Sequence, residues 1–262
     1  MAWMSWLKWP DIIVDFGIQI YVAWRLSEGD VLYRDIIYFM GPLSSYIHGF
    51  LFKLFGPGFL VLVTFNIFLV VCLTALIFHL FNFLGDSVSG TLSALAFLTI
   101  FAFSQYLWVG NYNFVVSYVY DLTHGIFLCF LAFPLLVKFA LRGTTLQSAG
   151  LGILTGLILL TKFEVFLAWI ISLTFGFILL FKVSQPHRVK FSKYFWTFMM
   201  AAALPPVAFF FYFFFHMPAN KALEAILTPW AFVIGAPNLI LPFYQNIMGL
   251  SNLPANIKIM TF

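Results

Sequence analysis

Apolar residues occur along most of the chain in long runs that short polar segments interrupt. The clearest runs cover residues 58–82, 88–107, 125–141 and 194–215. About 20 apolar residues in an α-helix are enough to span the hydrocarbon core of a bilayer. Each run therefore predicts a membrane-spanning helix. Pro205 and Pro206 predict a kink in the last of them, because proline cannot donate the helical hydrogen bond.

A further apolar run, residues 148–182, is too long for a single crossing. Lys162 and Glu164 lie near its middle, and charged groups at the centre of a bilayer are costly. The sequence therefore predicts two shorter helices, over residues 148–161 and 165–182, with the two charges between them at one membrane face.

Two segments near the N-terminus have the pattern of amphipathic helices instead. Residues 16–28 form the first, which Gly29 ends, and residues 44–55 form the second. Gly41 and Pro42 between them indicate a turn. Helices of this kind are typical of the membrane interface rather than of a crossing.

Together these elements predict an all-α polytopic membrane protein with about six spanning helices and amphipathic interfacial helices in its first outer loop. We interpret residues 1–262 as a single transmembrane domain. Residues 1–57 are its first outer loop, residues 58–215 carry the spanning helices, and residues 216–262 begin a further outer loop.

The composition indicates that the solvent of this chain is lipid. Hydrophobic residues make up 63% of it and charged residues 8%, whereas a soluble domain carries about 25% charged residues. This excludes an ordinary soluble domain, which needs more charge to cover its surface. The net charge of +4 is not arranged as a basic stripe, so nucleic acid is not an expected partner.

Basic residues gather between the predicted helices on one side. Lys138 and Arg142 follow one helix, and residues 182–193 contain Lys182, Arg188, Lys190 and Lys193. Helix alternation places these segments on the same side, which the positive-inside rule makes cytoplasmic. Asp86 falls on that side, and every other acid falls on the outer side. The outer loops are therefore the predicted place of any chemistry.

Two candidate groups lie in the first outer loop. Asp15 stands just before a predicted helix, where it can act as an N-cap. Alternatively, it faces a cavity as a carboxylate able to accept a proton or hold a divalent metal. Arg34 and Asp35 form either a simple surface ion pair or, through the planar fork of arginine, a phosphate-binding group.

Polar and aromatic side chains also crowd residues 111–124, with the sequence NYNFVVSYVYDLTH. Asp121 and His124 are three residues apart and share one face of a helix. They indicate a two-ligand metal site or, more simply, a hydrogen-bonded helix start. Lys162 and Glu164 indicate either interfacial snorkelling or a functional pair, since ionisable residues at membrane depth are functional candidates.

At this point the residues resemble a known family. Asp15, followed by WRLSEGDVLYRDIIYFMGPLSSY at residues 24–46, resembles the first outer loop of bacterial GT-C glycosyltransferases. These enzymes use polyprenyl-phosphate-linked sugars and are akin to protein O-mannosyltransferases and the lipid A aminoarabinose transferase. Residues 111–124 are similar to their second outer loop, and residues 161–164, TKFE, to their lysine-bearing helix junction.

The resemblance implies an enzyme of the bacterial plasma membrane that faces the non-cytoplasmic side. Its donor would be a polyprenyl-phosphate-linked sugar, and its acceptor a glycan, lipid or protein. Asp15 and Asp121 match the catalytic positions, and Arg34 and Lys162 would hold the phosphate of the carrier. The remaining substrate-binding positions are Tyr33, Asp35, Tyr38, Asn113, Tyr118, His124 and Glu164. The cofactor stays open, with a divalent metal near Asp15 as one option.

The chain departs from the family pattern at both ends. The family places a spanning helix before the first outer loop and several helices after the point where this sequence stops, so we expect a fragment or a shortened paralogue. Two alternatives to an active enzyme therefore stay open. One is a transporter or lipid-flipping module, which also places charges near helix ends at membrane depth. The other is an inactive membrane partner derived from such an enzyme.

Overall fold

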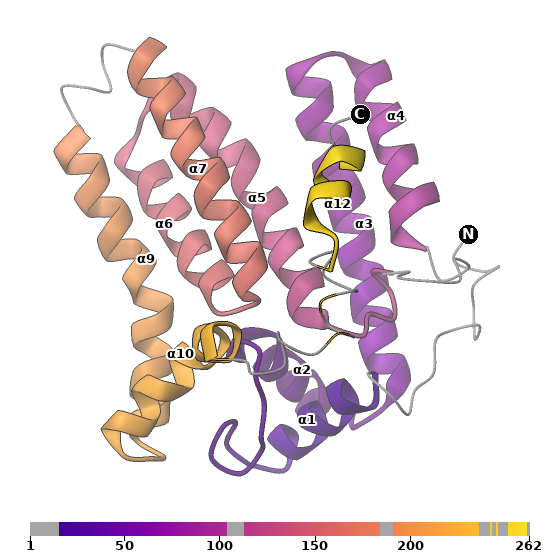
Figure 1. The fold of residues 1–262 in the computed structure, drawn as a ribbon, viewed down its shortest axis with the longest axis vertical. Coiled ribbons are helices and arrows are strands. Elements are labelled where there is room, and N and C mark those ends of the chain that lie inside the picture. Colours follow the sequence, from indigo (N-terminus) through magenta and orange to yellow (C-terminus); the bar gives the residue numbers. More distant parts are fainter. Residues whose placement is uncertain are drawn as a thin grey trace.

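The computed structural model describes residues 16–103, 113–183, 191–235, 242, 245 and 251–260. Apart from one isolated β-bridge between Leu32 and Ile36, its regular structure is helical. The helices are α1 (Gly17–Ser27), α2 (Pro42–Phe55), α3 (Phe59–Leu84), α4 (Ser87–Ala96) with the π-helix η2 (Phe97–Ala102), α5 (Tyr120–Arg142), α6 (Thr145–Leu159), α7 (Phe163–Val183), α9 (Phe191–Phe214), α10 (Ala219–Gly235) and α12 (Leu253–Met260) (Figure 1).

Three of the described helices are long and apolar enough to cross a membrane. They cover Phe59–Leu84, Tyr120–Leu141 and Ser192–Phe214. Three further apolar helices are shorter, covering Ser87–Ala102, Thr145–Leu159 and Phe163–Ile178. The described part of the chain is all-helical, as predicted, and three of its helices are candidates for crossing a membrane. The predicted number of about six crossings is not confirmed, because the other three apolar stretches fall short of that length as far as their side chains are described.

The predicted break in the long apolar run is confirmed. α6 ends at Leu159 and α7 begins at Phe163, so Lys162 lies in the turn between two helices. The boundaries differ from the prediction by a few residues, and Glu164 lies in the first turn of α7 rather than between the helices. One of the largest of these differences is at α5, which begins at Tyr120, whereas the apolar run begins at residue 125. Asp121 belongs to the first turn of α5, where the exposed N–H groups of a helix favour a carboxylate.

The connections between helices gather at two opposite ends (Figure 1). At one end lie the α3–α4 turn, the α5–α6 turn, the last turn of α7 and the first turn of α9. At the other end lie α1, α2, the α6–α7 turn and α10. The end of α5, which carries Lys138, and the first turn of α9, which carries Lys193, thus lie at the same end, as the distribution of charge predicts. Arg188 and Lys190 lie outside the described residues.

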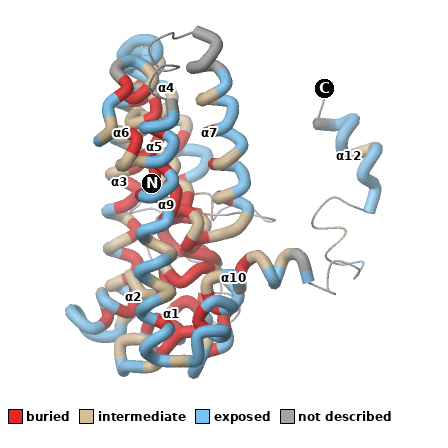
Figure 2. Tube along the Cα trace, turned by 90° about the vertical axis from the view of Figure 1, so that its left-hand side faces the viewer, coloured by how far each residue is buried: buried red, intermediate tan, exposed pale blue. Residues whose placement is uncertain are grey.

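Buried residues form a column through the bundle and continue into the end that carries α1 and α2 (Figure 2). Among them are Phe16 and Phe52 from the interfacial segments, which belong to the same core as Leu62, Leu73 and Tyr120 of the longer helices. α1 and α2 are thus fixed to the longer helices by burial of large apolar side chains.

Close packing of α6 against α9 depends on two glycines spaced four residues apart. A Cβ atom at Gly152 would overlap the carbonyl oxygen of Phe198, and one at Gly156 would overlap that of Ala202. Small residues four apart let two helix backbones approach closely, which is a common way to associate helices in lipid.

We expect Gly156→Leu to lower the thermal stability of the detergent-solubilised protein strongly. The added side chain forces α6 away from the backbone of α9, and such overpacking costs about 1–3 kcal/mol or more. Ile153→Phe is the matched control, because it adds bulk at a side chain of α6 that is 41% exposed. Equal melting temperatures for the two variants would contradict this account of the α6–α9 contact.

Candidate functional site

The loop before α2 is attached to the turn between α6 and α7. The Gly41 N–H donates to the Thr161 carbonyl at 2.8 Å, and the Leu43 N–H donates to the Leu160 carbonyl at 3.0 Å. A Cβ atom at Gly41 would overlap both carbonyl oxygens, so only glycine allows this approach. The two hydrogen bonds bring residues 38–46 next to Lys162, which lies in the same turn.

The first turns of α5 pack against the same place. A Cβ atom at Gly125 would lie 2.8 Å from Oγ1 of Thr161 and 3.0 Å from Cγ1 of Val165. Asp121 lies one turn before Gly125 on the same helix. Three segments distant in sequence therefore meet: the loop before α2, the start of α5 and the α6–α7 turn. We call this meeting point the junction.

Asp121 is the buried carboxylate of the junction, with no exposed surface. Its Oδ2 accepts a hydrogen bond of 2.7 Å from the Tyr38 hydroxyl, and that hydroxyl accepts one of 3.5 Å from Nε2 of Gln19. Its Oδ1 has no hydrogen-bond partner within the described part of the chain. Lys162 is near enough to interact electrostatically with the carboxylate. Ser44 also interacts with this carboxylate as a side-chain hydrogen-bonding group. Oδ2 is thus held directly by Tyr38, and Oδ1 is the less well satisfied oxygen.

A second set of polar groups lies on the α2 side of Asp121. Nδ1 of His124 is 2.9 Å from the Ser44 hydroxyl, and the His124 ring lies 5.0 Å from the ring of His48, measured between centroids. Both histidines are buried, and Nε2 of each lacks a partner among the described residues. Burial, and then the neighbouring His124, lowers the pKa of His48 well below its usual range. His48 is therefore neutral at physiological pH.

The sequence did not single out Ser44 or His48. A signal was present, because positions 44 and 48 are four residues apart and lie on one face of an amphipathic helix. Both lie on the buried face of α2. Polar residues on the helix face that packs against the rest of the protein are informative. Ser44 and His48 at this spacing were the signal that the sequence offered.

Lys162 is linked to an apolar groove through its neighbour Glu164. Its ammonium is 3.4 Å from Oε1 of Glu164, and the two side chains are 17% and 59% exposed. Glu164 also lines a groove of about 350 Å³ between α5 and α7. The other walls are mostly apolar, among them Ile126, Phe130 and Trp169. The junction thus combines a half-buried cation with an adjacent apolar groove.

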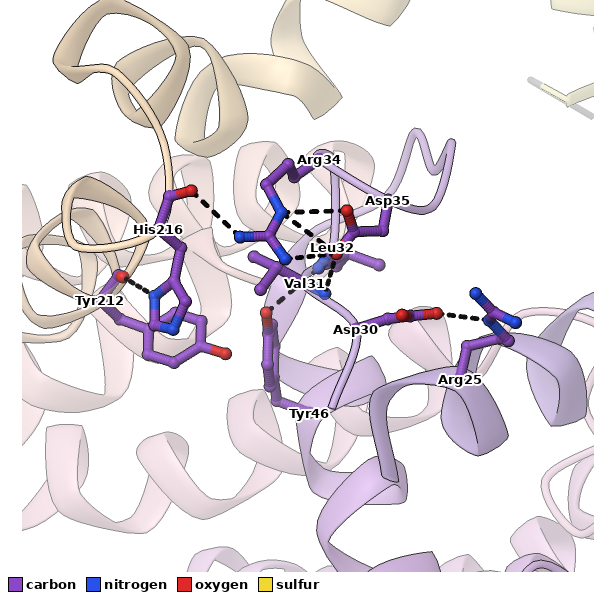
Figure 3. A network of polar contacts seen from close by, with 9 residues as sticks. All are labelled: Arg25, Asp30, Val31, Leu32, Arg34, Asp35, Tyr46, Tyr212 and His216. Atoms are coloured by element: carbon purple, nitrogen blue, oxygen red, sulfur yellow. Dashed lines mark hydrogen bonds and ion pairs between the residues drawn. The ribbon is translucent and has the colours of Figure 1, made fainter. Parts of the chain in front are cut away.

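Arg34 and Asp35 form a separate polar network at the exposed edge of the loop (Figure 3). Oδ2 of Asp35 accepts from Nη2 of Arg34 at 2.7 Å and from the Val31 N–H at 2.8 Å. Nη1 of Arg34 donates to the His216 carbonyl at 3.2 Å. The Arg34 hydrogen bond, and then the Val31 N–H, lowers the pKa of Asp35 to about 2. Asp35 is therefore ionised, and the guanidinium of Arg34 is occupied by groups of the chain itself.

Other predicted positions serve the local backbone. Asn113 is buried, and its amide donates to the Val116 carbonyl at 2.9 Å and accepts from the Val116 N–H at 2.6 Å. Tyr33 has a positive φ of 66° and donates from its hydroxyl to the Met40 carbonyl at 2.5 Å. Tyr118 is 43% exposed. These residues shape the loops around the junction.

Asp15 and Asn111 lie outside the described residues, so the predicted catalytic role of Asp15 stays a prediction. Within the described residues, no three His, Cys, Asp or Glu side chains form a group that could hold a metal ion. Asp121 and His124 thus lack a third ligand there. The chemistry proposed below is assigned to side chains of the chain alone.

Comparison with models of protein families, with curated proteins and with solved structures finds no match to this chain. The resemblance to GT-C glycosyltransferases therefore rests on the motifs of the outer loops. The geometry of the junction has to carry any proposal for function.

Proposed function

We propose that this protein is a membrane glycosyltransferase that moves a sugar from a polyprenyl-phosphate donor to a hydroxyl group of a glycan, lipid or protein acceptor at the outer face of the plasma membrane. One observation carries the proposal. A buried aspartate, Asp121, has one oxygen fixed by Tyr38 and one without a direct hydrogen-bond partner among the described residues, beside Lys162 and an apolar groove. Ionisable residues buried at membrane depth are functional candidates by default.

In the proposed reaction, the acceptor hydroxyl oxygen attacks the anomeric carbon of the donor sugar. A new carbon–oxygen bond forms while the bond from that carbon to the phosphate oxygen breaks. Oδ1 of Asp121 takes the hydroxyl proton, and the bonding electrons leave with polyprenyl phosphate. The ammonium of Lys162 stabilises the charge that develops on the departing phosphate. Atoms and charges balance with no soluble co-reactant.

The groove between α5 and α7 suits the lipid part of such a donor. Its walls are mostly apolar, and it begins at Glu164, two residues after Lys162. A phosphate at Lys162 would therefore place the start of the polyprenyl chain at the groove. Asp121 is fully buried, so we propose that the loop carrying Tyr38 moves to admit the acceptor.

We also propose that the shorter apolar helices complete six crossings. α6 and α7 run between the α6–α7 turn and the opposite end of the bundle, whereas α4 with η2 starts at that opposite end and stops short of α1 and α2 (Figure 1). α6 has 15 residues, about 22 Å at 1.5 Å per residue, which is shorter than a hydrocarbon core of about 30 Å. Local thinning of the bilayer and flanking polar residues accommodate such a mismatch at modest cost.

The test of the function is a reaction in proteoliposomes with a purified polyprenyl-phosphate-linked sugar and a membrane extract as the source of acceptor. We expect loss of the donor, release of polyprenyl phosphate and appearance of the sugar on an acceptor. Movement of the donor between leaflets without its loss would instead support the transporter. If the donor is neither consumed nor moved between leaflets, the result would support an inactive partner.

Tyr38→Phe is expected to lower the transfer rate by roughly 10- to 100-fold, because a hydrogen bond to a charged group contributes about 1.5–3 kcal/mol. The variant keeps the ring but removes the hydroxyl that holds Oδ2 of Asp121. Tyr21→Phe, at a tyrosine that is 49% exposed on α1, is the control and should leave the rate unchanged. An unchanged rate for Tyr38→Phe would show that Asp121 does not depend on this hydrogen bond.

A further inference from the structure

A pocket of about 190 Å³ lies between α3 and α5, far along both helices from the junction. It is lined by His79, Leu80, Phe83, Pro134, Val137 and Lys138. His79 precedes the end of α3 by five residues and Lys138 precedes the end of α5 by four. At 1.5 Å per residue, both lie roughly 6–8 Å from their helix ends, at the end where the basic connections gather.

Two groups able to donate hydrogen bonds to an anion thus face one pocket from two different helices. Lys138 carries a positive charge, and a histidine ring offers an N–H in either protonation state. Neither side chain forms an ion pair within the described part of the chain. Asp86 is the only described acid at this end, and its Oδ1 accepts at 2.7 Å from the Ser89 N–H, capping α4.

His79 also lines a second, larger cavity. This groove of about 600 Å³ runs between α3 and α4, from His79 to Phe103. The hydroxyls of Thr74 and Thr91 in its wall donate to carbonyls of their own helices, each at 2.7 Å. The groove is therefore apolar along its length, and it meets the cationic pocket at His79.

We propose that His79 and Lys138 bind the phosphate of an anionic phospholipid, one acyl chain of which lies in the groove between α3 and α4. Three observations agree: paired donors about one turn inside the helix ends, an adjoining apolar groove, and the lack of a carboxylate partner among the described residues. A lysine at this depth extends its ammonium to the headgroup layer. The positive-inside rule makes this end cytoplasmic, where the leaflet is rich in anionic lipid.

The occupant is a phospholipid rather than the proposed donor. The donor would bind at the outer face through Lys162, at the opposite end of the bundle. A membrane phospholipid supplies both a phosphate at the level of His79 and Lys138 and an acyl chain that reaches inward along α3. This proposal is independent of the catalytic one, because it concerns other residues and other chemistry.

The test is native mass spectrometry of the full chain in detergent, titrated separately with phosphatidylglycerol and phosphatidylcholine of identical acyl chains. We expect the wild type to prefer phosphatidylglycerol. Lys138→Gln should reduce that preference about fivefold, since one basic residue near an anionic surface contributes about 1 kcal/mol. Adding His79→Gln should reduce it further, and Lys138→Arg should retain it.

Lys53→Gln is the matched control, because Lys53 is also exposed in the last turn of a helix but at the opposite end of the bundle. Its preference should equal that of the wild type. If the wild type and the double variant, His79→Gln with Lys138→Gln, preferred phosphatidylglycerol equally, the proposal would be overturned. Non-specific surrounding lipid would then explain the binding. Donor turnover plays no part in this readout, so its result is separate from the fate of the proposed function.

Discussion

Asp121→Asn is expected to lower the rate of sugar transfer by roughly 10²–10⁴-fold, the contribution typical of a positioned general base. The amide has almost the same shape as the carboxylate, and its oxygen can still accept from the Tyr38 hydroxyl. It cannot take a proton from the acceptor. The substitution therefore removes the proposed chemistry with little change in packing, and initial rates of polyprenyl phosphate release measure it.

Glu224→Gln is the matched control for this prediction. Glu224 is a carboxylate 60% exposed in an ion pair with Lys221, and it also becomes an amide. Its rate should stay within about twofold of the wild type, because exposed ion pairs contribute little. If the folded Asp121→Asn variant transferred sugar as fast as Glu224→Gln, Asp121 would have no role in the mechanism.

Lys162→Gln is expected to lower kcat by roughly 10²–10³-fold, the range seen when one group that stabilises developing charge is removed. The charge on the phosphate grows as the bond to the sugar breaks, so Lys162 should act more strongly on the transition state than on the bound donor. The rate constant kcat should consequently fall more than KM rises, which a donor titration measures.

Lys221→Gln is the matched control, because Lys221 also pairs with a nearby glutamate but is 60% exposed. We expect it to leave both kinetic constants near those of the wild type. A Lys162→Gln enzyme with normal kcat and a raised KM would indicate uniform binding of the donor. A normal kcat and a normal KM would show that the phosphate binds elsewhere.

The sequence predicts most of the helical framework because hydrophobic length and buried charge are strong constraints in lipid. The run from residue 58 becomes α3, and the charged pair marks the break in the long run, with Lys162 between α6 and α7 and Glu164 in the first turn of α7. The start of α5 was harder to place. Tyr120 and Asp121 are polar, yet tertiary packing against the α6–α7 turn buries them in the first turn of the helix.

The candidate site is only partly visible in the sequence. Tyr38, Asp121, His124 and Lys162 were predicted as candidates one by one, and the structure brings them to one junction. Their meeting depends on the backbone contact of Gly41 with the α6–α7 turn, which no local pattern encodes. The same holds for Ser44, whose partner His124 is 80 residues away in sequence.

Local hydrogen bonds also decide what predicted residues do. Arg34 carries the chemistry of a phosphate site in the sequence, and in the structure its guanidinium donates to Asp35 and to the His216 carbonyl. The amide of Asn113 binds its own loop. A sequence pattern shows which groups a residue can offer, whereas only the fold shows which of those groups are already occupied.

The most direct test of the central claim, that the junction binds the lipid-linked donor, is to map where that donor binds. A polyprenyl-phosphate-linked sugar with a photoreactive group in its first isoprene units would be cross-linked in proteoliposomes and located by peptide mass spectrometry. We predict labels on α5 and α7 beside the groove, around Ile126 and Ala168, and their loss in Lys162→Gln. Labels confined to the groove between α3 and α4, or labels on α5 and α7 that persist unchanged in Lys162→Gln, would contradict the account.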